Sequence, residues 1–426
     1  MNHASRCLTV VLLFILSSVS GRSQAPFWEA TGSPTTGSLN AITVTKAGSL
    51  FAVTDSGIFA SGNQGASWHS AYAHAGYNNY LTITAASGGL VLAACQTPDG
   101  AAIVRRPDTL AGWSTTLIHS LYLVSSIAVS PVTGHIMACD AMIGDFYRST
   151  DGGVQFDSLG NFGVFGGGGV PEAVYSADGT LIGSSHSRIF RSTDDGNTWS
   201  AVDSVSAGDD LFSLTADRFG NVAAGSENGY VFRSTDNGAH WNTMGPIVPY
   251  VTSLVISGPN TIVVGSRGMI GRGIAITTDG GTTWNPKNDG LTDTTIVALA
   301  VDSSGTLYAV AHYIINPDNV MFRSSGPILS VASSTGEMPG RFTLGQNYPN
   351  PFNPTTTISY SLPKGGHVTL SVFNMLGELV ARLVDGQQNA GYHDVTFNGD
   401  GLASGVYICR IQSGSFVDVQ KLMLMK

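Results

Sequence analysis

The sequence has 426 residues, a length that accommodates two or three domains with sizeable buried cores. Only 12% of the residues are charged and 53 are glycine, which argues against a disordered chain and against a mainly helical one. The formal net charge is −9 and no basic residues cluster to neutralise phosphates, so we expect no nucleic-acid partner.

The first 25 residues have the pattern of an export signal that is removed from the mature protein. Arg6 supplies a positive charge, residues 8–16 form a short apolar core, and small residues follow. This core is too short to span a bilayer as a stable helix. Ser23-Gln24-Ala25 fits the small-x-small cleavage pattern, but Pro26 would follow that cut, so cleavage near Gly21 is an equal alternative. Because no second long apolar run follows, we expect no transmembrane segment in the mature protein.

A short segment, which we call the box, recurs along the chain. It reads Ser-Thr-Asp-Asp-Gly-Asn-Thr-Trp from Ser192 to Trp199, and most copies keep the hydroxyl, the acid, the glycine and the aromatic residue. Seven boxes start at residues 61, 106, 149, 192, 234, 277 and 324, in steps of 42 to 47 residues. Asn63 replaces the acid in the first copy, Leu110 takes the glycine place in the second, and the last copy lacks its aromatic residue.

A repeat of this length corresponds to four strands with their turns, which is one blade of a β-propeller. The seven box starts therefore predict an all-β fold with a seven-bladed propeller over residues 26–326. The mature N-terminus reads Phe27-Trp28-Glu29-Ala30, like the strand that leaves a box. We expect this first strand to complete the last blade beside Phe322-Arg323, which joins the chain ends and removes an open edge.

Each box predicts a tight hairpin between the third and fourth strands of its blade. The carboxylate can accept N–H bonds inside its own turn, the glycine can take a positive φ, and the aromatic ring can pack between sheets. Catalysis would not need the same turn seven times, so we interpret these residues as structural: Asp151, Asp194, Asp236, Asp279, Trp199, Trp241 and Trp284. Four arginines share one repeat position before a box and are structural on the same ground: Arg148, Arg191, Arg233 and Arg323. The pattern resembles the Asp-box of the BNR repeat families.

Beyond the last box the composition changes twice. Residues 327–340 are rich in serine, glycine and proline, as linkers are. In residues 341–426, apolar side chains alternate along about seven short strands, for example at Ile358, Tyr360 and Leu362. This alternation predicts a small immunoglobulin-like β-sandwich.

The predicted sandwich carries a specific set of motifs. They are Asn-Tyr-Pro-Asn-Pro-Phe-Asn-Pro over residues 347–354, Val372-Phe373-Asn374, Gly405-Val406-Tyr407, and the ending Lys-Leu-Met-Leu-Met-Lys over residues 421–426. Together they resemble the type A sorting domain of type IX secretion. The resemblance implies export by the type IX secretion machinery, and a protein secreted or displayed on the outer-membrane surface of a Gram-negative bacterium. The region is also similar to the Ig-like module of flagellar hook-capping proteins, but a flagellar part would not carry an export signal and a propeller.

Chain direction sorts the turns of a propeller onto two faces. In an antiparallel blade the first and third turns share one face, here called the box face, and the second turns and blade-to-blade links share the other, here called the link face. Non-repeated polar and aromatic residues gather on the link face: Asp55, Asp99, Asp145, His186, Glu227, Arg267, Tyr313, Tyr72, His74, Tyr77 and Tyr80. Such side chains suit a sugar or peptide site, so the candidate ligand-binding residues are Tyr72, Tyr77, Glu227 and Arg267. The competing interpretation is that these are the ordinary polar turn residues of any propeller.

We predict no catalytic residue, no metal site and no cofactor. The glycine-rich stretch 163–169 lacks the Lys-Ser/Thr of a phosphate loop, and the ten histidines show no metal-ligand spacing. We therefore expect a recognition module for an unknown glycan or protein ligand. The first alternative is a glycoside hydrolase or lyase, to which Asp145 and Glu227 could supply two carboxylates. The second is an assembly scaffold that resembles the photosystem assembly-factor propellers.

Three cysteines remain after removal of the signal. Cys95, Cys139 and Cys409 are odd in number and have no metal-ligand spacing. We expect buried thiols, with a disulfide between Cys95 and Cys139 as the alternative because these two fall at matching places in neighbouring repeats.

Overall fold

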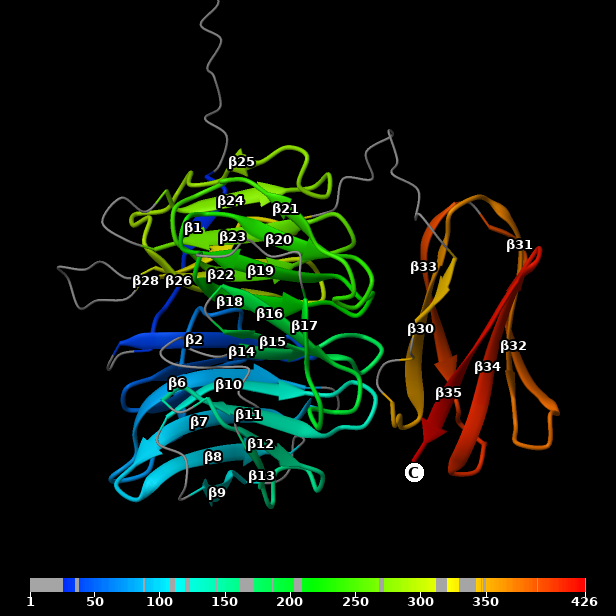
Figure 1. Ribbon diagram of the computed structural model, residues 1–426, viewed down its shortest axis with the longest axis horizontal. Coiled ribbons are helices and arrows are strands. Elements are labelled where there is room, and N and C mark those ends of the chain that lie inside the picture. Colours follow the sequence, from blue (N-terminus) through cyan, green and yellow to red (C-terminus); the bar gives the residue numbers. More distant parts are fainter. Residues whose placement is uncertain are drawn as a thin grey trace, which may run out of the picture.

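The computed structural model describes residues 26–426 except 35–37, 87–88, 108–111, 119–122, 143, 161–171, 186, 203–208, 268–271, 312–319, 329–341, 346, 348–349, 389 and 426. Every named element in these residues is a β-strand. Figure 1 shows the strands in two bodies, one coloured blue to yellow along the chain and the other gold to red. The expected export signal and most of the expected linker lie outside the described residues.

The first body consists, in the described residues, of seven four-stranded antiparallel sheets, as many as there are box starts; we number them blades 1 to 7. Blades 1 to 6 follow the chain: β2 (Leu39–Val44), β3 (Leu50–Thr54), β4 (Gly57–Ser61) and β5 (His69–Tyr72); β6 (Asn78–Ala85), β7 (Val91–Thr97), β8 (Gly100–Arg106) and β9 (Ser114–Ile118); β10 (Val124–Val129), β11 (Ile136–Asp140), β12 (Phe146–Ser149) and β13 (Asp157–Gly160); β14 (Glu172–Tyr175), β15 (Leu181–Ser185), β16 (Arg188–Ser192) and β17 (Ser200–Val202); β18 (Leu211–Ala216), β19 (Val222–Ser226), β20 (Val231–Ser234) and β21 (Asn242–Met244); β22 (Val251–Ile256), β23 (Ile262–Ser266), β24 (Ile274–Thr277) and β25 (Asn285–Pro286). The first strands of successive sheets contact one another around a closed ring, from β2 through β6, β10, β14, β18 and β22 to β26 (Ile296–Val301) and back to β2. This is the arrangement of a β-propeller.

Blade 7 is made from both ends of the propeller sequence. It combines β26, β27 (Leu307–Ala311) and β28 (Val320–Ser324) with β1 (Trp28–Ala30). Trp28 pairs with Ser324 and Ala30 with Phe322, so the predicted closure by the N-terminal strand is confirmed. The Trp28 side chain is 1% exposed, and its indole N–H donates to the Lys287 carbonyl at 2.6 Å. The first strand is therefore anchored to blade 6 as well as paired in blade 7.

The apolar core of the propeller lies between neighbouring blades. In the described residues, seven buried clusters each combine side chains from two adjacent sheets. The aromatic residue of each box packs into the cluster between its own blade and the preceding one: Trp68, Trp113, Phe156, Trp199, Trp241 and Trp284. Trp28 takes the same place between blades 6 and 7, where the seventh box supplies none. One large ring thus packs against every junction, and it is buried in the case of Trp28 and Trp241 and partly buried in the others.

The second body is a sandwich of two antiparallel sheets. One contains β29 (Thr343–Leu344), β30 (Thr355–Leu362) and β33 (Gly391–Asn398), and the other has the order β32 (Leu379–Gln388), β31 (Gly366–Phe373), β34 (Gly405–Ser413), β35 (Phe416–Leu424). Ile358, Tyr360 and Leu362 all point into the core, as their alternation predicts. The sandwich has its own buried cluster, which contains side chains of this second body alone.

The described cysteines are all buried thiols. Cys95 lies between blades 1 and 2 and Cys139 between blades 3 and 4, so the alternative disulfide is not formed. Burial raises the pKa of Cys95 to about 12 and that of Cys409 to about 12, which keeps both thiols protonated.

Replacement of Trp28 should destabilise the whole propeller because it opens the ring. We expect Trp28→Ala to lower the free energy of unfolding by about 3–5 kcal/mol, the usual cost of removing a large buried side chain. Trp28→Phe keeps most of the packing and loses the bond to the Lys287 carbonyl, so its cost should be smaller. Chemical denaturation of the three proteins measures both effects, and equal stability of Trp28→Ala and wild type would contradict the closure.

Candidate functional site

The boxes form turns whose polar atoms bond to one another. In blade 4 the Ser192 hydroxyl donates to Asp194 Oδ1 at 2.8 Å and accepts the Gly196 N–H at 2.9 Å. The same carboxylate oxygen accepts the Thr198 N–H at 2.8 Å. The boxes that start at residues 61, 149, 234 and 277 repeat all three bonds. The box acids are therefore used by the fold itself, whereas Asp108 and Leu110 of the second copy lie outside the described residues.

Two successive box residues have a left-handed backbone. The predicted glycine does so, with φ 86° at Gly196, and so does the residue before it, with φ 60° at Asp195. The other boxes repeat this at Gln64 and Gly65, Gly152 and Gly153, Asn237 and Gly238, and Gly280 and Gly281. The box pattern predicts the second position but not the first. A signal was present, because the first position holds only Gly, Asn, Asp or Gln in these copies, and most of these tolerate positive φ.

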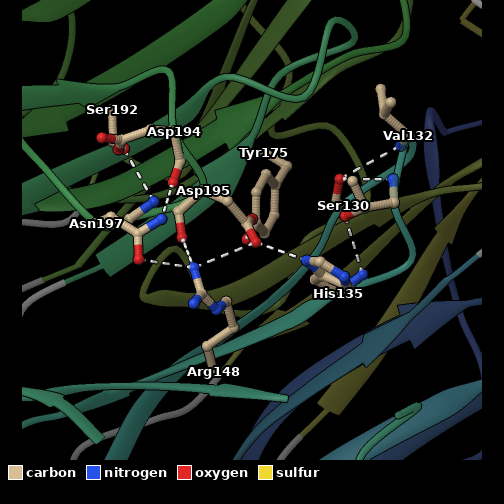
Figure 2. A network of polar contacts seen from close by, with 11 residues as sticks. Ser130, Val132, His135, Arg148, Tyr175, Ser192, Asp194, Asp195 and Asn197 are labelled. Atoms are coloured by element: carbon tan, nitrogen blue, oxygen red, sulfur yellow. Dashed lines mark hydrogen bonds and ion pairs between the residues drawn. The ribbon is translucent and has the colours of Figure 1, made fainter. Parts of the chain in front are cut away.

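In the described residues, five of the seven boxes also receive an arginine from the preceding blade. The Arg148 guanidinium donates to the Asp195 carbonyl at 2.8 Å, a bond drawn in Figure 2. Equivalent bonds run from Arg105 to Gly152, from Arg191 to Asn237 and from Arg233 to Gly280, while Arg323 donates to the Gln64 side chain. The arginines before the boxes thus join neighbouring blades, and they are not available to hold a ligand carboxylate in the way that a substrate-binding arginine would be.

A denser polar network surrounds Asp195 between blades 3 and 4. Figure 2 shows Asp195 between His135, Tyr175 and Arg148. Its carboxylate contacts His135 Nδ1 at 2.6 Å and accepts the Tyr175 hydroxyl at 2.5 Å. Burial, helped by the Asp195 carboxylate, raises the pKa of Tyr175 above its usual value. Because these groups satisfy one another, the network reinforces a blade junction and offers no open position to a substrate.

A hollow of about 540 Å³ opens on the box face, between the first turns of blades 1, 2, 5, 6 and 7. Its acids close their own turns: Asp217 accepts the Asn221 N–H at 2.9 Å, and Asp302 accepts the Thr306 N–H at 2.9 Å. The turn encloses the Asp217 carboxylate, and this burial raises the pKa of Asp217 to about 6. The residue as a whole is only partly buried. The hollow lies on the face opposite to the predicted ligand-binding residues.

Hydroxyl groups link the innermost strands of neighbouring blades. Ser126 accepts the Ala173 N–H at 3.2 Å and Ser253 accepts the Leu299 N–H at 2.9 Å. Glu172 occupies the same position in blade 4 and accepts the N–H of Leu214. Burial raises the pKa of Glu172 to about 8, and that hydrogen bond lowers it only in part. Glu172 thus takes the place of a structural serine.

Glu227 and Arg267 lie close together on the link face, in blades 5 and 6. The Glu227 N–H donates to the Asp210 carbonyl at 2.8 Å, the Tyr250 N–H to the Glu227 carbonyl at 2.9 Å, and the Arg267 N–H to the Tyr250 carbonyl at 3.1 Å. Glu227 is half-buried and Arg267 is exposed. Within the part of the chain that the structure describes, neither the Glu227 carboxylate nor the Arg267 guanidinium has a hydrogen-bond or ion-pair partner. Among the described residues, no contact prevents either charged group from meeting a ligand.

The turn that carries Glu227 is held by a buried acid. Asp209 accepts the Ser226 hydroxyl and, at 2.9 Å, the Asn228 N–H. Asp209 is 5% exposed, so these bonds form away from water. The backbone of Glu227 is fixed from both sides, which limits how far its side chain can move.

Two exposed aromatic rings stand beside this pair of charges, and sequence reasoning missed them. Phe212 and Tyr250 are 38% and 44% exposed, and their rings stack at 27° with 6.5 Å between centroids. Tyr250 has φ 51°, a left-handed conformation that is uncommon and costly for a bulky residue. Phe212 lies in β18 and Tyr250 in the link between blades 5 and 6, so neither residue belongs to a box.

Tyr72 and Tyr77 form a separate cluster at the junction of blades 1 and 2. The Tyr72 hydroxyl lies 2.8 Å from Thr115 Oγ1, and the His74 and Tyr77 rings are 4.2 Å apart. Burial, with a smaller contribution from Tyr72, raises the pKa of Tyr77. Along the ring, blade 7 separates this junction from blades 5 and 6 on one side, and blades 3 and 4 do so on the other. Tyr80 is fully buried, and His186 and Tyr313 lie outside the described residues.

Comparison with known proteins identifies the C-terminal region. Residues 346–425 match the secretion system C-terminal sorting domain family. The protein is therefore a cargo of the type IX secretion machinery, secreted or held at the outer-membrane surface of a Gram-negative bacterium. No helix in the described residues is long and apolar enough to cross a membrane. No curated protein matches the sequence.

Solved structures resemble the propeller. YCF48 from Cyanidioschyzon merolae is 13% identical with a TM-score of 0.53, over 70% of this chain and 98% of that one. YCF48 bound to D1 peptide is 16% identical with a TM-score of 0.54, over 71% and 98%. The extracellular domain of BT4673 from B. thetaiotaomicron is 13% identical with a TM-score of 0.50, over 91% of this chain and 57% of that one. At these identities the likeness shows the β-propeller fold alone.

Loss of a box carboxylate should destabilise the fold. Asp194→Ala removes the acceptor for the Ser192 hydroxyl and the Thr198 N–H, and we expect a cost of about 1–3 kcal/mol in thermal or chemical unfolding. Asp194→Asn should cost less, since Asn63 makes the equivalent bonds in the first box. A lower stability of Asp194→Asn than of Asp194→Ala would contradict this role of the carboxylate.

The box acids should also make the protein sensitive to acid. Hydrogen bonds from Thr283 and Thr277 outweigh burial and lower the pKa of Asp279 from 3.8 to about 2, and the pKa values of Asp151, Asp194 and Asp236 are lowered as well. Acids with a lowered pKa stabilise the folded state above about pH 3.8, and this contribution disappears as the pH falls towards 2. Melting curves between pH 2 and pH 6 measure the slope, which should be shallower in Asp279→Asn. An identical slope in that variant would exclude Asp279 as a cause.

Proposed function

We propose that the protein is a secreted, non-enzymatic recognition propeller that binds a glycan or a segment of an extracellular protein on its link face. The observation that supports this most directly is the exposed Phe212–Tyr250 pair beside the uncommitted charges of Glu227 and Arg267. The box face lacks such a combination among the groups described above, because its acids and arginines bond to neighbouring turns.

The chemistry of this cluster suits an amphipathic ligand. Aromatic faces stack on the apolar face of a sugar ring or on a peptide side chain, and they lose little conformational freedom in doing so. The Glu227 carboxylate can accept hydrogen bonds from hydroxyl or amide groups, and the Arg267 guanidinium can donate to hydroxyl or carbonyl oxygens. Because backbone bonds hold these segments together, little ordering is needed when a ligand arrives.

Delivery outside the cell restricts the ligand to extracellular molecules. The sorting domain directs the propeller to the medium or the cell surface, where glycans and proteins of other cells are available. YCF48 is described in complex with a D1 peptide, so a propeller of similar fold holds a peptide in that protein. This favours a peptide ligand over a large globular surface, and an assembly scaffold remains the third interpretation.

The enzyme alternative depends on a second carboxylate near Glu227. Asp145 belongs to blade 3 and Glu227 to blade 5, with blade 4 between them along the ring. Burial, with a contribution from Asp140, raises the pKa of Asp145, as a general acid requires. A glycosidase would need the two carboxyl groups within about 5–10 Å of each other across the substrate. Glycan cleavage that disappears in Glu227→Gln would favour this alternative.

Binding to a glycan and peptide array should identify the ligand class and locate the site. We expect Phe212→Ala combined with Arg267→Ala to weaken any binding that the full-length protein shows by at least about tenfold, as removal of interface anchors does. Val154→Ser removes an exposed apolar side chain from a box and serves as the matched control, which should bind as wild type does. All variants should keep the wild-type melting temperature.

A third variant tests whether the two link-face clusters act together. Tyr77→Ala changes only the junction of blades 1 and 2, so loss of binding there would mean that the ligand spans the ring. Undiminished binding by the Phe212→Ala, Arg267→Ala protein, with loss in the box-face control, would place the site on the box face instead.

A further inference from the structure

The sandwich carries the most exposed large apolar side chains among the described residues. Leu376 is 84% exposed and Met375 is 69% exposed, and both lie in the hairpin turn between β31 and β32. Leu379, at the start of β32, is 49% exposed. Contiguous apolar surface on a secreted domain marks an interaction site more often than a structural need.

Strand register extends this surface from the turn onto the outer face of the sheet. Phe373 pairs with Leu379 on one side and with Ile408 on the other. These three residues lie on the face opposite to the buried Val372 and Cys409, and both Phe373 and Ile408 are half-exposed. We call the five residues Met375, Leu376, Leu379, Phe373 and Ile408 the tip patch. The C-terminal strand β35 ends beside it, since Ile408 pairs with Lys421.

The turn is built to hold its apolar side chains in water. Asn374 Oδ1 accepts the N–H groups of Leu376 and Glu378, both at 3.0 Å. The Asn374 side-chain amide donates to the Glu378 carboxylate at 2.7 Å, and Gly377 takes φ 80°. A flexible loop could fold Leu376 back onto the sheet. This turn instead holds the Leu376 side chain in water, where its exposed apolar area costs free energy.

The other motifs of the region are used inside the domain. Phe352 is 1% exposed in the sandwich core, and its N–H and carbonyl bond to Met423 and Met425 of the C-terminal strand. Asn350 Oδ1 accepts the Met423 N–H at 2.7 Å. The Asn-Pro segment therefore clamps the end of the chain. In the described residues, Phe373 is the member of the motif set that belongs to the tip patch, and Met425 of the ending is exposed as well.

We propose that the secretion machinery recognises this sorting domain through the tip patch, and that the patch inserts into an apolar groove on a component of the type IX secretion machinery. The patch lies within residues 346–425, the region that matches the sorting-domain family, and it adjoins the C-terminal strand. This inference does not depend on what the propeller binds.

Two other occupants fit the patch less well. A lipid surface attracts apolar side chains that are flanked by several basic residues, whereas this patch has one acid, Glu378 in its turn, and one base, Lys421 beside Ile408. A second copy of the chain would need about 800 Å² of surface from each partner, more than five partly exposed side chains supply. A narrow apolar groove that receives one hairpin tip matches the size and the apolar character of the patch.

Export of the full-length protein in its native bacterium tests the proposal. Met375→Ser combined with Leu376→Ser should reduce the extracellular protein at least about tenfold and leave it in the periplasm. Met375→Leu combined with Leu376→Met keeps the apolar surface and should be exported at the wild-type level. Val417→Ser combined with Val419→Ser is the matched control, because these valines are 48% and 54% exposed on the same sheet face, nearer its other end. Deletion of residues 341–426 sets the value for complete loss of sorting.

Folding is monitored in the same proteins. The serine variant should melt as wild type does, since both side chains are mostly in water. If it melts lower, Leu376→Gln alone repeats the test with a smaller change. Wild-type export of a stable tip variant would overturn the proposal. Flotation of the purified protein with phosphatidylglycerol vesicles, or dimerisation in size-exclusion chromatography, would also overturn it if either were lost in the serine variant.

Discussion

The hydrogen bond from an arginine to the box of the next blade is the link on which the ring depends. The box carboxylate shapes a turn with two left-handed residues, and this turn aims a backbone carbonyl at the preceding blade. Arg148 and Arg233 then donate to Asp195 and Gly280 respectively. Five of the seven junctions are joined by such an arginine on the box face in the described residues, while an aromatic ring packs into the apolar junction beneath. A charged donor in a partly buried site makes a stronger bond than a neutral one.

Because these contacts lie on the box face, the two faces of the propeller have different roles. Residues on the box face repeat from blade to blade because most junctions use the same contacts. The link face is under no such constraint, so Phe212, Tyr250, Glu227 and Arg267 can differ from their counterparts in other blades. Asp209 still holds the turn of Glu227 in place, so this turn is fixed even though its residues do not repeat.

The repeats made most of the propeller predictable, and their absence limited the prediction of the site. Box spacing predicted the sheets, and the resemblance of Trp28 to a box aromatic predicted how blade 7 is completed. The pairing of Phe212 with Tyr250 could not be predicted, because contacts between blades at unrepeated positions leave no periodic signal. Tyr80 was misplaced on the surface since its strand begins earlier than its polar neighbours suggest, which buries the ring. In the sandwich the motifs revealed the family, but only the strand register separated the clamped Phe352 from the exposed Leu376.

Because blade 7 combines β1 with the last three strands of the propeller, the ring can close only after all of its strands are present. β1 precedes every other strand of the propeller in the sequence, and its partner β28 follows only after six other blades. Until then Trp28 has no junction to occupy and the edge of β28 has no pair. A chain that lacks β28 therefore exposes an unpaired strand and the Trp28 indole ring, the features that make incompletely folded chains aggregate and require chaperones. The ring therefore closes only when the whole propeller is present. The sorting domain, which follows the propeller in the sequence, then directs the molecule to the outer membrane.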